Sequence, residues 1–488
     1  MSETRPNETI LEVIERRLIP DEQAKKARGE VFTPLNIVRE LLYGLRKTDL
    51  ENGKQVIWGV DPDGNIIDDD EANRVGGIPL ELWRDPDTEW FDPANGIGNF
   101  PFVAFHMLDH QLKMHGTKGS KEWADEERRK HIVENMLYMV EIDRGNVNTT
   151  FKIMDYLSPG SKPNICCADT LKLKEDDLRR HFNTSTFDVV MGNPPFNTPR
   201  ETKGQTTTLW DKFIVYGLGI LKENGYMAFI TPANWRRPEN TLFNLMVDEN
   251  QLQYLHILGE KDAKALFGGI SIRIDMYTVQ HKAKYTNTLI VDELGMYHTF
   301  DLKGLPFLPN YAYDEIKALL AKEGDGIKVI FSSSIYEHRK NYVKKEQTEE
   351  FKYPIVHSMT QSGLGFLYTN NNTKGHFGQP KVLLNVGRHQ YPYNDYEGKY
   401  GMSQIVFGLP ITSKEEGDQM VEAMNTDDFK KIIKATKWGT FQTDYRMFKY
   451  FKPDFYKEFL KKPDVGGRRK TLRRETHVSS AKTYRKHS

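Results

Sequence analysis

An amide, two prolines and an aromatic ring follow one another at the end of an apolar run, in the segment VVMGNPPFN of residues 189–197. Proline cannot donate a hydrogen bond to a sheet, so this pattern predicts a strand that ends here. One interpretation is an ordinary proline turn. The other is a chemical site, in which Asn193 and the rigid backbone of Pro194 and Pro195 offer two oxygen acceptors and Phe196 offers a stacking face.

Three other apolar runs also end in residues that suit a ligand. In FDPANGIGNF, Gly96 and Gly98 would let the backbone turn tightly and approach a ligand closely. In MVEIDR, Glu141 could accept hydrogen bonds from ribose hydroxyls, and in CCADTL, Asp169 could accept one from an adenine amino group. Each feature has an ordinary alternative, namely a glycine turn, a solvated carboxylate and a helix N-cap.

The elements that would position these residues are strands alternating with helices. This alternation, which begins near Glu89, predicts an α/β fold with a parallel sheet and helices on both faces. Such sheets bind ligands at the carboxyl ends of their strands, where the residues above are found. The strand-like segments are TEWFDP, NMLYMVEID, SKPNICCAD, FDVVMGNPP, GYMAFITP, LQYLHILG and RIDMYTVQHK.

The chain divides into regions of different pattern. Residues 1–28 are predicted to be helical, and 29–285 to form the α/β domain, in which 46–88 is an insertion with a hairpin signal, VIWGVDPDGNII. Beyond residue 285 the alternation fades, and 286–465 is predicted to be a second, mixed α+β domain. Residues 466–488 are basic and polar, which is typical of a disordered tail.

Composition narrows the class of protein. The chain has 488 residues with 68 Lys+Arg and 68 Asp+Glu, and two adjacent cysteines, Cys166 and Cys167. Adjacent cysteines suit neither a structural disulfide nor a zinc site, so we expect no metal and a reducing compartment: the cytoplasm, or a nucleus or viral factory. The longest apolar runs fall short of the ~20 residues of a membrane span, and the polar N-terminus is not typical of a signal peptide.

Taken in order, DPANGIGNF, VEID, CADT and GNPPF resemble the adenine-N6 DNA methyltransferases that use S-adenosylmethionine (SAM). The order matches the group in which the cofactor motifs precede the catalytic motif and the target-recognition domain comes last. The resemblance covers roughly residues 29–285, including GEVFTP near the N-terminus. More loosely, the remainder is similar to the recognition domains of restriction-modification methylases, chiefly in FGQPKVLLNVGRHQYP.

The resemblance implies a set of cofactor contacts along the sheet edge. Glu141 would bind the ribose hydroxyls and Asp169 the adenine amino group, while Ile142 would line the adenine slot unless it belongs to the core. Asp92 would lie near the amino group of SAM, and Thr33, with Glu30, near its methionine end. The implied cofactor-binding residues are Thr33, Asp92, Gly96, Gly98, Glu141, Ile142, Asp169 and Asn193.

The resemblance also gives the NPPF segment a role. The adenine N6 lone pair is delocalised into the ring, so an enzyme must draw it out of the plane. The side-chain oxygen of Asn193 and the carbonyl of Pro194 would each accept one N6 hydrogen and stabilise the charge that develops on N6. Pro195 would hold the backbone and Phe196 would stack on the base, which must be flipped out of the duplex.

Further assignments depend more weakly on the pattern. Asn234 and Trp235 follow the predicted fifth strand and would border the substrate cleft. Phe267 would back the flipped base, although core packing is the simpler interpretation. The basic runs WRRPEN and HRKNYVKK, and the tail, are solvated surface or contacts to DNA phosphates.

Other functions remain open from the sequence. Enzymes that methylate a glutamine amide in release factors also carry NPP and an aromatic residue, although they lack a long domain after it. A non-catalytic DNA-binding subunit with the same fold is a second alternative. If the chain is a DNA methylase, its partner is double-stranded DNA, it acts as a monomer, and a separate restriction endonuclease is a further partner, since no nuclease motif is evident.

Overall fold

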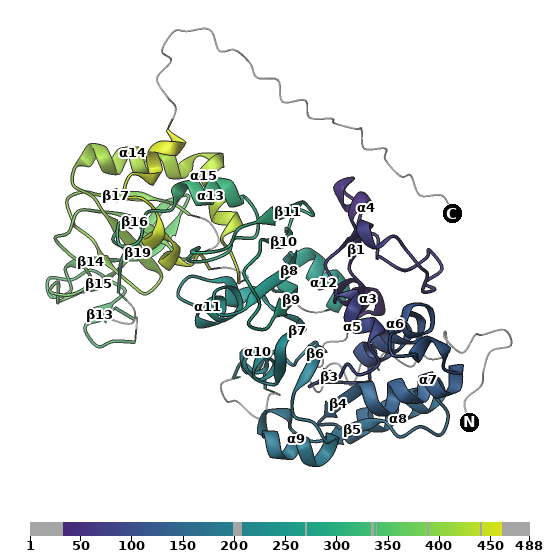
Figure 1. The fold of residues 1–488 in the computed structure, drawn as a ribbon. Helices are drawn as coiled ribbons and strands as arrows, with labels where there is room; N and C mark the ends of the chain where they lie inside the picture. The colour runs from purple at the N-terminus through teal and green to yellow at the C-terminus, as the bar shows by residue number, and fades with distance from the viewer. Residues whose placement is uncertain are drawn as a thin grey trace, which may run out of the picture.

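The protein consists of two bodies that lie side by side, as a computed structural model shows (Figure 1). The first contains a large sheet with flanking helices, and the second contains two smaller sheets with helices. The structure describes residues 33–198, 207–268, 271–332, 336–337, 339–387, 390–439 and 442–460. The predicted helical segment 1–28, Glu30 and the predicted tail 466–488 lie outside these residues.

A nine-stranded sheet forms the centre of the first body. Its strand order is β11-β10-β8-β9-β7-β6-β3-β4-β5. All seven predicted strands are present, and the sheet is mostly parallel, except that β9 runs antiparallel to both β7 and β8 and the edge strand β11 runs antiparallel to its neighbour β10. The predicted strands are β3 (Trp90–Asp92), β4 (Leu137–Glu141), β5 (Asn164–Cys167), β6 (Phe187–Gly192), β7 (Leu221–Pro232), β8 (Gln251–Leu258) and β9 (Ile274–Gln280).

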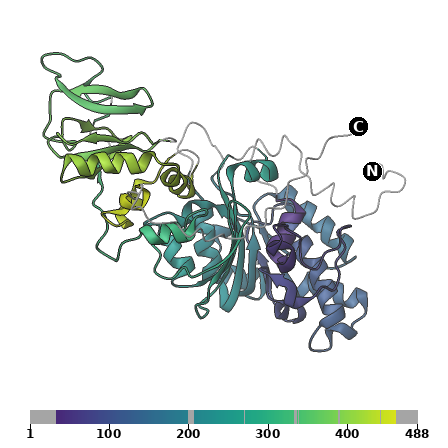
Figure 2. The same cartoon turned by 90° about the horizontal axis from the view of Figure 1, so that it is seen from above.

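Helices cover both faces of this sheet. Figure 2 shows the purple and blue helices of residues 35–157 on one side and teal helices on the other. Their apolar side chains form one continuous core with the strands, in which Trp83 and Trp90 have ring centroids 4.2 Å apart. The helices are α3 (Leu35–Tyr43), α6 (Asn99–His115), α7 (Asp125–His131), α8 (Arg144–Leu157), α9 (Glu175–Phe182), α10 (Trp210–Gly219), α11 (Thr241–Val247) and α12 (Glu260–Phe267).

The predicted insertion 46–88 contains short elements around a tight turn. It includes α4 (Lys47–Glu51), β2 (Arg74–Val75) and α5 (Leu80–Arg84), with β1 (Leu45–Arg46) at its start. The predicted hairpin is present as an antiparallel bridge between Val60 and Ile66. Gly64, at φ 87°, supplies the left-handed residue that this turn needs.

The sheet extends past residue 285, where we predicted the first domain to end. β10 (Thr288–Val291) pairs with β8, and β11 (Tyr297–Phe300) pairs with β10 as an antiparallel hairpin. A hairpin at a sheet edge needs no crossover helix, so the loss of strand–helix alternation did not mark the end of the sheet. The boundary between the two bodies therefore falls after Phe300.

The second body has the predicted mixed α+β character. One four-stranded sheet has the order β12-β19-β16-β17 and the other β13-β15-β14-β18. Its strands are β12 (Ile330–Phe331), β13 (Val343–Lys344), β14 (Tyr353–Thr360), β15 (Gly363–Thr369), β16 (Lys381–Asn385), β17 (Tyr393–Asp395), β18 (Gly401–Met402) and β19 (Val406–Pro410), and its helices are α13 (Tyr313–Leu319), α14 (Lys414–Asn425) and α15 (Asp427–Ala435). No helix in the described ranges is both long and apolar enough to cross a membrane.

A buried arginine joins the two bodies. Arg236, which follows β7, has no exposed side-chain surface. Its five N–H groups donate to both carboxylate oxygens of Asp275, the carbonyls of Leu308 and Pro309, and Oδ1 of Asn310, at 2.7–3.2 Å. The interpretation of WRRPEN as a solvated or DNA-binding run is therefore wrong for this residue, because its charge is neutralised inside the protein.

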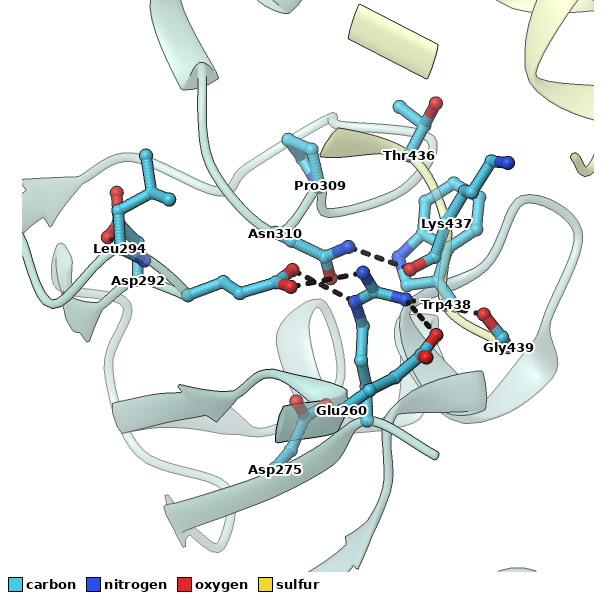
Figure 3. Close-up of polar contacts among 12 residues, drawn as sticks. Glu260, Asp275, Asp292, Leu294, Pro309, Asn310, Thr436, Lys437, Trp438 and Gly439 are labelled. Carbon is cyan, nitrogen blue, oxygen red and sulfur yellow. Dashed lines mark hydrogen bonds and ion pairs between the residues drawn. The ribbon is translucent and has the colours of Figure 1, made fainter. Parts of the chain in front are cut away.

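A second arginine reinforces the same junction. Arg273 donates to Glu293 at 2.9 and 3.0 Å, to Glu260 at 3.2 Å and to the carbonyl of Gly439 at 3.3 Å. Figure 3 shows Glu260, from α12, and Gly439, from the second body, meeting at this point. The two bodies are thus connected through desolvated polar contacts and not only through the chain that links them.

Candidate active site

Four strand ends bring the predicted site residues to one edge of the sheet. Strands β6, β3, β4 and β5 are neighbours and all run parallel, so their carboxyl ends meet. Asp92 ends β3 and Glu141 ends β4, while Asp169 and Asn193 directly follow β5 and β6. The strand that follows β3 in the sequence, β4, lies on one side of it in the sheet, and β6 lies on the other side. The strand order therefore reverses at β3, and such a switch point is where α/β sheets bind ligands.

The glycine segment forms the turn between β3 and α6. Gly96 has φ 56° and Gly98 has φ 99°, so both need the left-handed conformation that glycine adopts without strain. A Cβ on Gly96 would meet no atom within 4 Å, so this part of the loop is open to a ligand. Asn95 fixes the loop, because its N–H donates to Val140 and its side chain donates to Thr150 at 2.8 Å.

Glu141 connects the glycine loop to the next strand end. Its side chain is 7% exposed, and its two oxygens accept from the N–H groups of Gly96 at 2.7 Å and Asp143 at 2.8 Å. A carboxylate has about four acceptor positions, so Glu141 can accept from several donors at once. The predicted glycine loop and the predicted carboxylate therefore belong to one hydrogen-bonded unit.

Asp92 is a buried carboxyl group with one unpartnered oxygen. Oδ1 accepts from the N–H of Ala94 at 3.0 Å, whereas Oδ2 has no hydrogen-bond partner among the described residues. Burial raises the pKa of Asp92 well above its usual range, and the charge of Glu141 adds to this effect. Gly192 leaves room for this group, since a Cβ there would lie 3.0 Å from Oδ1.

Ile142 and Asp169 occupy the outer part of the edge. Ile142 is 70% exposed, which excludes the alternative that it belongs to the core. Asp169 caps a short 3-10 helix by accepting from the N–H of Leu171 at 3.2 Å, and its other oxygen pairs with Lys172 at 3.0 Å. The N-cap alternative for Asp169 is thus correct, and it leaves the carboxylate partly exposed at the predicted place.

The NPPF segment begins directly where β6 ends. The Asn193 side-chain nitrogen donates to the Thr33 hydroxyl at 2.9 Å, and the Asn99 side-chain nitrogen donates to the Thr33 carbonyl at 2.7 Å. Pro194 is buried and Pro195 is exposed. Thr33 and Asn193, which are far apart in sequence, therefore lie together at the sheet edge.

The ring of Phe196 is mostly enclosed by protein. It is 8% exposed and packs in the main hydrophobic core, and its carbonyl accepts from the N–H of Leu209. In this structure the ring packs against core side chains, and stacking on a base would require one face of the ring to be exposed. The predicted stacking contact stays a prediction.

The residues assigned more weakly to the substrate cleft are mostly buried. Trp235 is fully buried against Phe243 and Tyr277 and so does not border a cleft, and Asn234 beside it is only partly exposed. Phe267 is a core residue, as the simpler interpretation had it. The sequence interpretation missed Asn95 and Asn99, although their position on either side of the two glycines was a usable signal.

Comparison with known proteins gives a likeness for part of the first body. Residues 97–263 match the model of the Eco57I restriction-modification methylase family. The match begins within the glycine loop and includes Glu141, Asp169 and Asn193, so three of the four strand ends described above lie within the matched residues.

Individual relatives are distant. A tRNA (guanine(6)-N2)-methyltransferase of Methanocaldococcus jannaschii is 23% identical over 46% of this chain and 61% of its own length. An uncharacterized adenine-specific methylase of Mycoplasma pneumoniae is 24% identical over 34% of this chain and 53% of its own. The match therefore spans between about half and three fifths of these relatives. The Type IIL restriction-modification enzyme MmeI, solved in complex with DNA, shares 11% identity over 76% of this chain and 62% of its own, with a TM-score of 0.47.

The residues at the sheet edge fit the cofactor of such methylases. Buried side-chain oxygens of Asp92, Asn95 and Asn99 have no hydrogen-bond partner among the described residues. Buried acceptors are nearly always satisfied, so these oxygens call for N–H or O–H donors from a ligand. An amino acid ammonium and ribose hydroxyls are such donors, and the exposed Ile142 offers an apolar face for a purine. The sheet edge thus has acceptors and an apolar surface that fit SAM.

Proposed function

We propose that the protein transfers a methyl group from SAM to the N6 nitrogen of a flipped-out adenine in double-stranded DNA. The observation that carries this proposal is the arrangement at the sheet edge. Glu141 ends β4 and Asp169 follows β5, while Asn193 follows β6 on the other side of β3. The proposed cofactor residues Glu141 and Asp169 thus lie on one side of the switch point at β3, and the proposed substrate residue Asn193 lies on the other.

Bound SAM would supply an electrophilic methyl group. Glu141, which the N–H groups of Gly96 and Asp143 hold at the sheet edge, would accept hydrogen bonds from the ribose hydroxyls. Asp169 would accept from the adenine amino group, and Ile142 would cover one face of that ring. Asp92 and Thr33 would lie toward the methionine end.

Asn193 and Pro194 would act on the substrate amino group. Each would accept one N6 hydrogen, which turns the N6 lone pair out of the base plane and toward the methyl group. As the new N–C bond formed, the bond from the methyl carbon to the SAM sulfur would break and its electron pair would stay on sulfur. The two acceptor oxygens would stabilise the positive charge that develops on N6 more strongly than the neutral amine. One N6 proton then leaves to solvent. The target adenine would reach this edge only when flipped out of the duplex, at a cost of a few kcal/mol.

The second body would select the DNA site. Its sheets and helices begin after β11 and contact the first body through the hydrogen bonds of Arg236 and Arg273. A recognition domain must hold its base contacts at a fixed distance from the flipped base, and a desolvated junction provides that fixed geometry. Double-stranded DNA is the partner that this arrangement implies.

The test of the function is methyl transfer with identification of the modified base. Duplex DNA, tRNA and a release-factor peptide are incubated with labelled SAM, and the products are analysed by mass spectrometry. We expect N6-methyladenine in DNA. Methylguanine in tRNA would favour the activity of the Methanocaldococcus relative, whose target is also a nucleobase amine. Methylglutamine alone, or DNA binding without transfer, would overturn the proposal.

Glu141→Ala is expected to weaken SAM binding by roughly 10- to 100-fold. The loss removes hydrogen bonds to a charged acceptor, which typically contribute ~1.5–3 kcal/mol. The measurement is the rise in melting temperature with SAM, which follows ligand affinity. Glu126→Ala, an exposed glutamate on α7, is the matched control and should leave this rise unchanged. An unchanged rise in both Glu141→Ala and Asp169→Ala would exclude this cofactor site.

Removal of the basic residues 468–488 is expected to lower DNA affinity by a similar factor for every sequence. Lysine and arginine contacts to phosphates release counterions and carry no sequence information. The measurement is the dissociation constant for target and non-target duplexes across a salt series, in which the shortened chain should show a flatter slope. A changed target sequence in the shortened chain would contradict this role.

A further inference from the structure

Thr33 holds two asparagines that come from different parts of the fold. The side-chain nitrogen of Asn193, after β6, donates to the Thr33 hydroxyl at 2.9 Å. The side-chain nitrogen of Asn99, at the start of α6, donates to the Thr33 carbonyl at 2.7 Å. Thr33 itself is only 4% exposed. The two contacts therefore form a chain from the glycine-loop helix to the NPPF segment.

The contact with Asn99 fixes the backbone of Thr33. A carbonyl oxygen can only accept, so the amide nitrogen of Asn99 must be the group that faces it. On the following side, Pro34 precedes α3 and has φ −57°, which restricts the backbone further. The Thr33 hydroxyl is thus presented to Asn193 from a backbone that is held on both sides.

The contact with Asn193 holds its amide in place. Because a hydroxyl can donate as well as accept, the N–H groups of the substrate decide which end of the held amide faces them. Asparagine has a donor end and an acceptor end, and they exchange places when the amide turns by half a rotation. With the nitrogen bonded to Thr33, the oxygen lies on the opposite side of the amide. The reversed amide would present its own N–H groups to the N6 hydrogens, which is a contact between donors.

We propose that Thr33 is a positioning residue that holds the Asn193 amide at the place where its oxygen can accept from the substrate. This assignment rests on the proposed methyl transfer and gives Thr33 a role other than the cofactor contact that the sequence suggests. The two roles predict different kinetics. A cofactor contact affects the affinity for SAM, whereas a positioning contact affects the turnover number at saturating SAM.

The test compares Thr33→Val with Thr33→Ser. Valine has nearly the same shape without the hydroxyl, and serine keeps the hydroxyl. A single neutral hydrogen bond sustains a population ratio of about fivefold, so we expect kcat of Thr33→Val to fall by about that factor. Thr33→Ser should stay near the wild type. The dissociation constant for SAM, measured by calorimetry without DNA, should change by less than about twofold in both variants.

Two further variants separate positioning from a general structural effect. Thr278 on β9 has a buried hydroxyl without a partner among the described residues, so Thr278→Val makes the same chemical change where no bond is lost. It should leave kcat unchanged. In an Asn193→Ala background, Thr33→Val should cause no additional loss, because the amide on which it acts is absent.

Three results would overturn the assignment. Equal losses of kcat in Thr33→Val and Thr33→Ser would show that the hydroxyl is not what matters. A weaker affinity for SAM with unchanged kcat would make Thr33 a cofactor contact. Additive losses in the double variant would show that Thr33 acts independently of Asn193. A wild-type protein that transfers no methyl group to DNA would instead refute the proposed function itself, and with it this role.

Discussion

Asn193→Ala is expected to reduce methyl transfer to DNA by about 10²–10³-fold, the usual cost of losing one preorganised contact to developing charge. Alanine removes one of the two oxygens that accept from N6, and the Pro194 carbonyl remains. SAM binding should persist, because Glu141 and the glycine loop belong to the other side of the switch point. The measurement is kcat for N6-methyladenine formation, together with the SAM-induced rise in melting temperature.

A matched control distinguishes chemistry from folding in this experiment. Asn244 lies exposed on α11, so Asn244→Ala removes the same amide from a surface position and should retain full activity. If Asn193→Ala kept more than about a tenth of the wild-type rate, the amide would not be one of the two acceptors. If it lost SAM binding as well, Asn193 would belong to the cofactor site.

The catalytic edge was predictable because its signals are local. A strand that ends in polar residues can be recognised from a few neighbouring residues, and parallel strands bring their ends together whatever lies between them. Glu141 and Asp169 could therefore be placed at one edge before any contact was known. The glycines Gly96 and Gly98 were recognisable for the same reason, since a left-handed turn limits the residue type.

Contacts between distant residues were not predictable in this way. Thr33 and Asn193 are 160 positions apart, and no local pattern indicates that a hydroxyl will meet an amide. The family resemblance placed Thr33 near the cofactor but did not indicate its bond to Asn193. Phe196 illustrates the same limit, since an aromatic residue after two prolines gives no sign of whether its ring will be open or packed in the core.

The basic run at Arg236 shows why charge alone does not identify a DNA contact. WRRPEN has the composition of a phosphate-binding surface, yet the partners of Arg236 are Asp275, 39 positions away, and Leu308, 72 positions away. A buried guanidinium is stable only when nearly all its donors are satisfied, and here all five are. The charge of Arg236 is used in the hydrogen bonds that join the two bodies.

Arg236→Ala is expected to lower the free energy of unfolding by about 3–5 kcal/mol, the usual cost of leaving a buried charge without its partner. Asp275 would remain fully buried, where desolvation already raises its pKa and Arg236 is the main group that opposes that effect. The Pro309 carbonyl and Oδ1 of Asn310 would lose their donor as well, while the Leu308 carbonyl would keep only Trp438. The measurement is the urea midpoint of unfolding relative to the wild type.

An exposed ion pair across the same junction provides the control. Lys449 contacts Glu239 at 2.7 Å, and both side chains are well exposed. Exposed pairs contribute between about 0 and 1 kcal/mol, so Lys449→Ala should leave the urea midpoint nearly unchanged. If Arg236→Ala destabilised the protein no more than Lys449→Ala does, the buried network would not hold the two bodies together. If instead only Arg236→Ala also relaxed the choice of DNA sequence at unchanged SAM affinity, the junction would be what fixes the recognition domain relative to the flipped base.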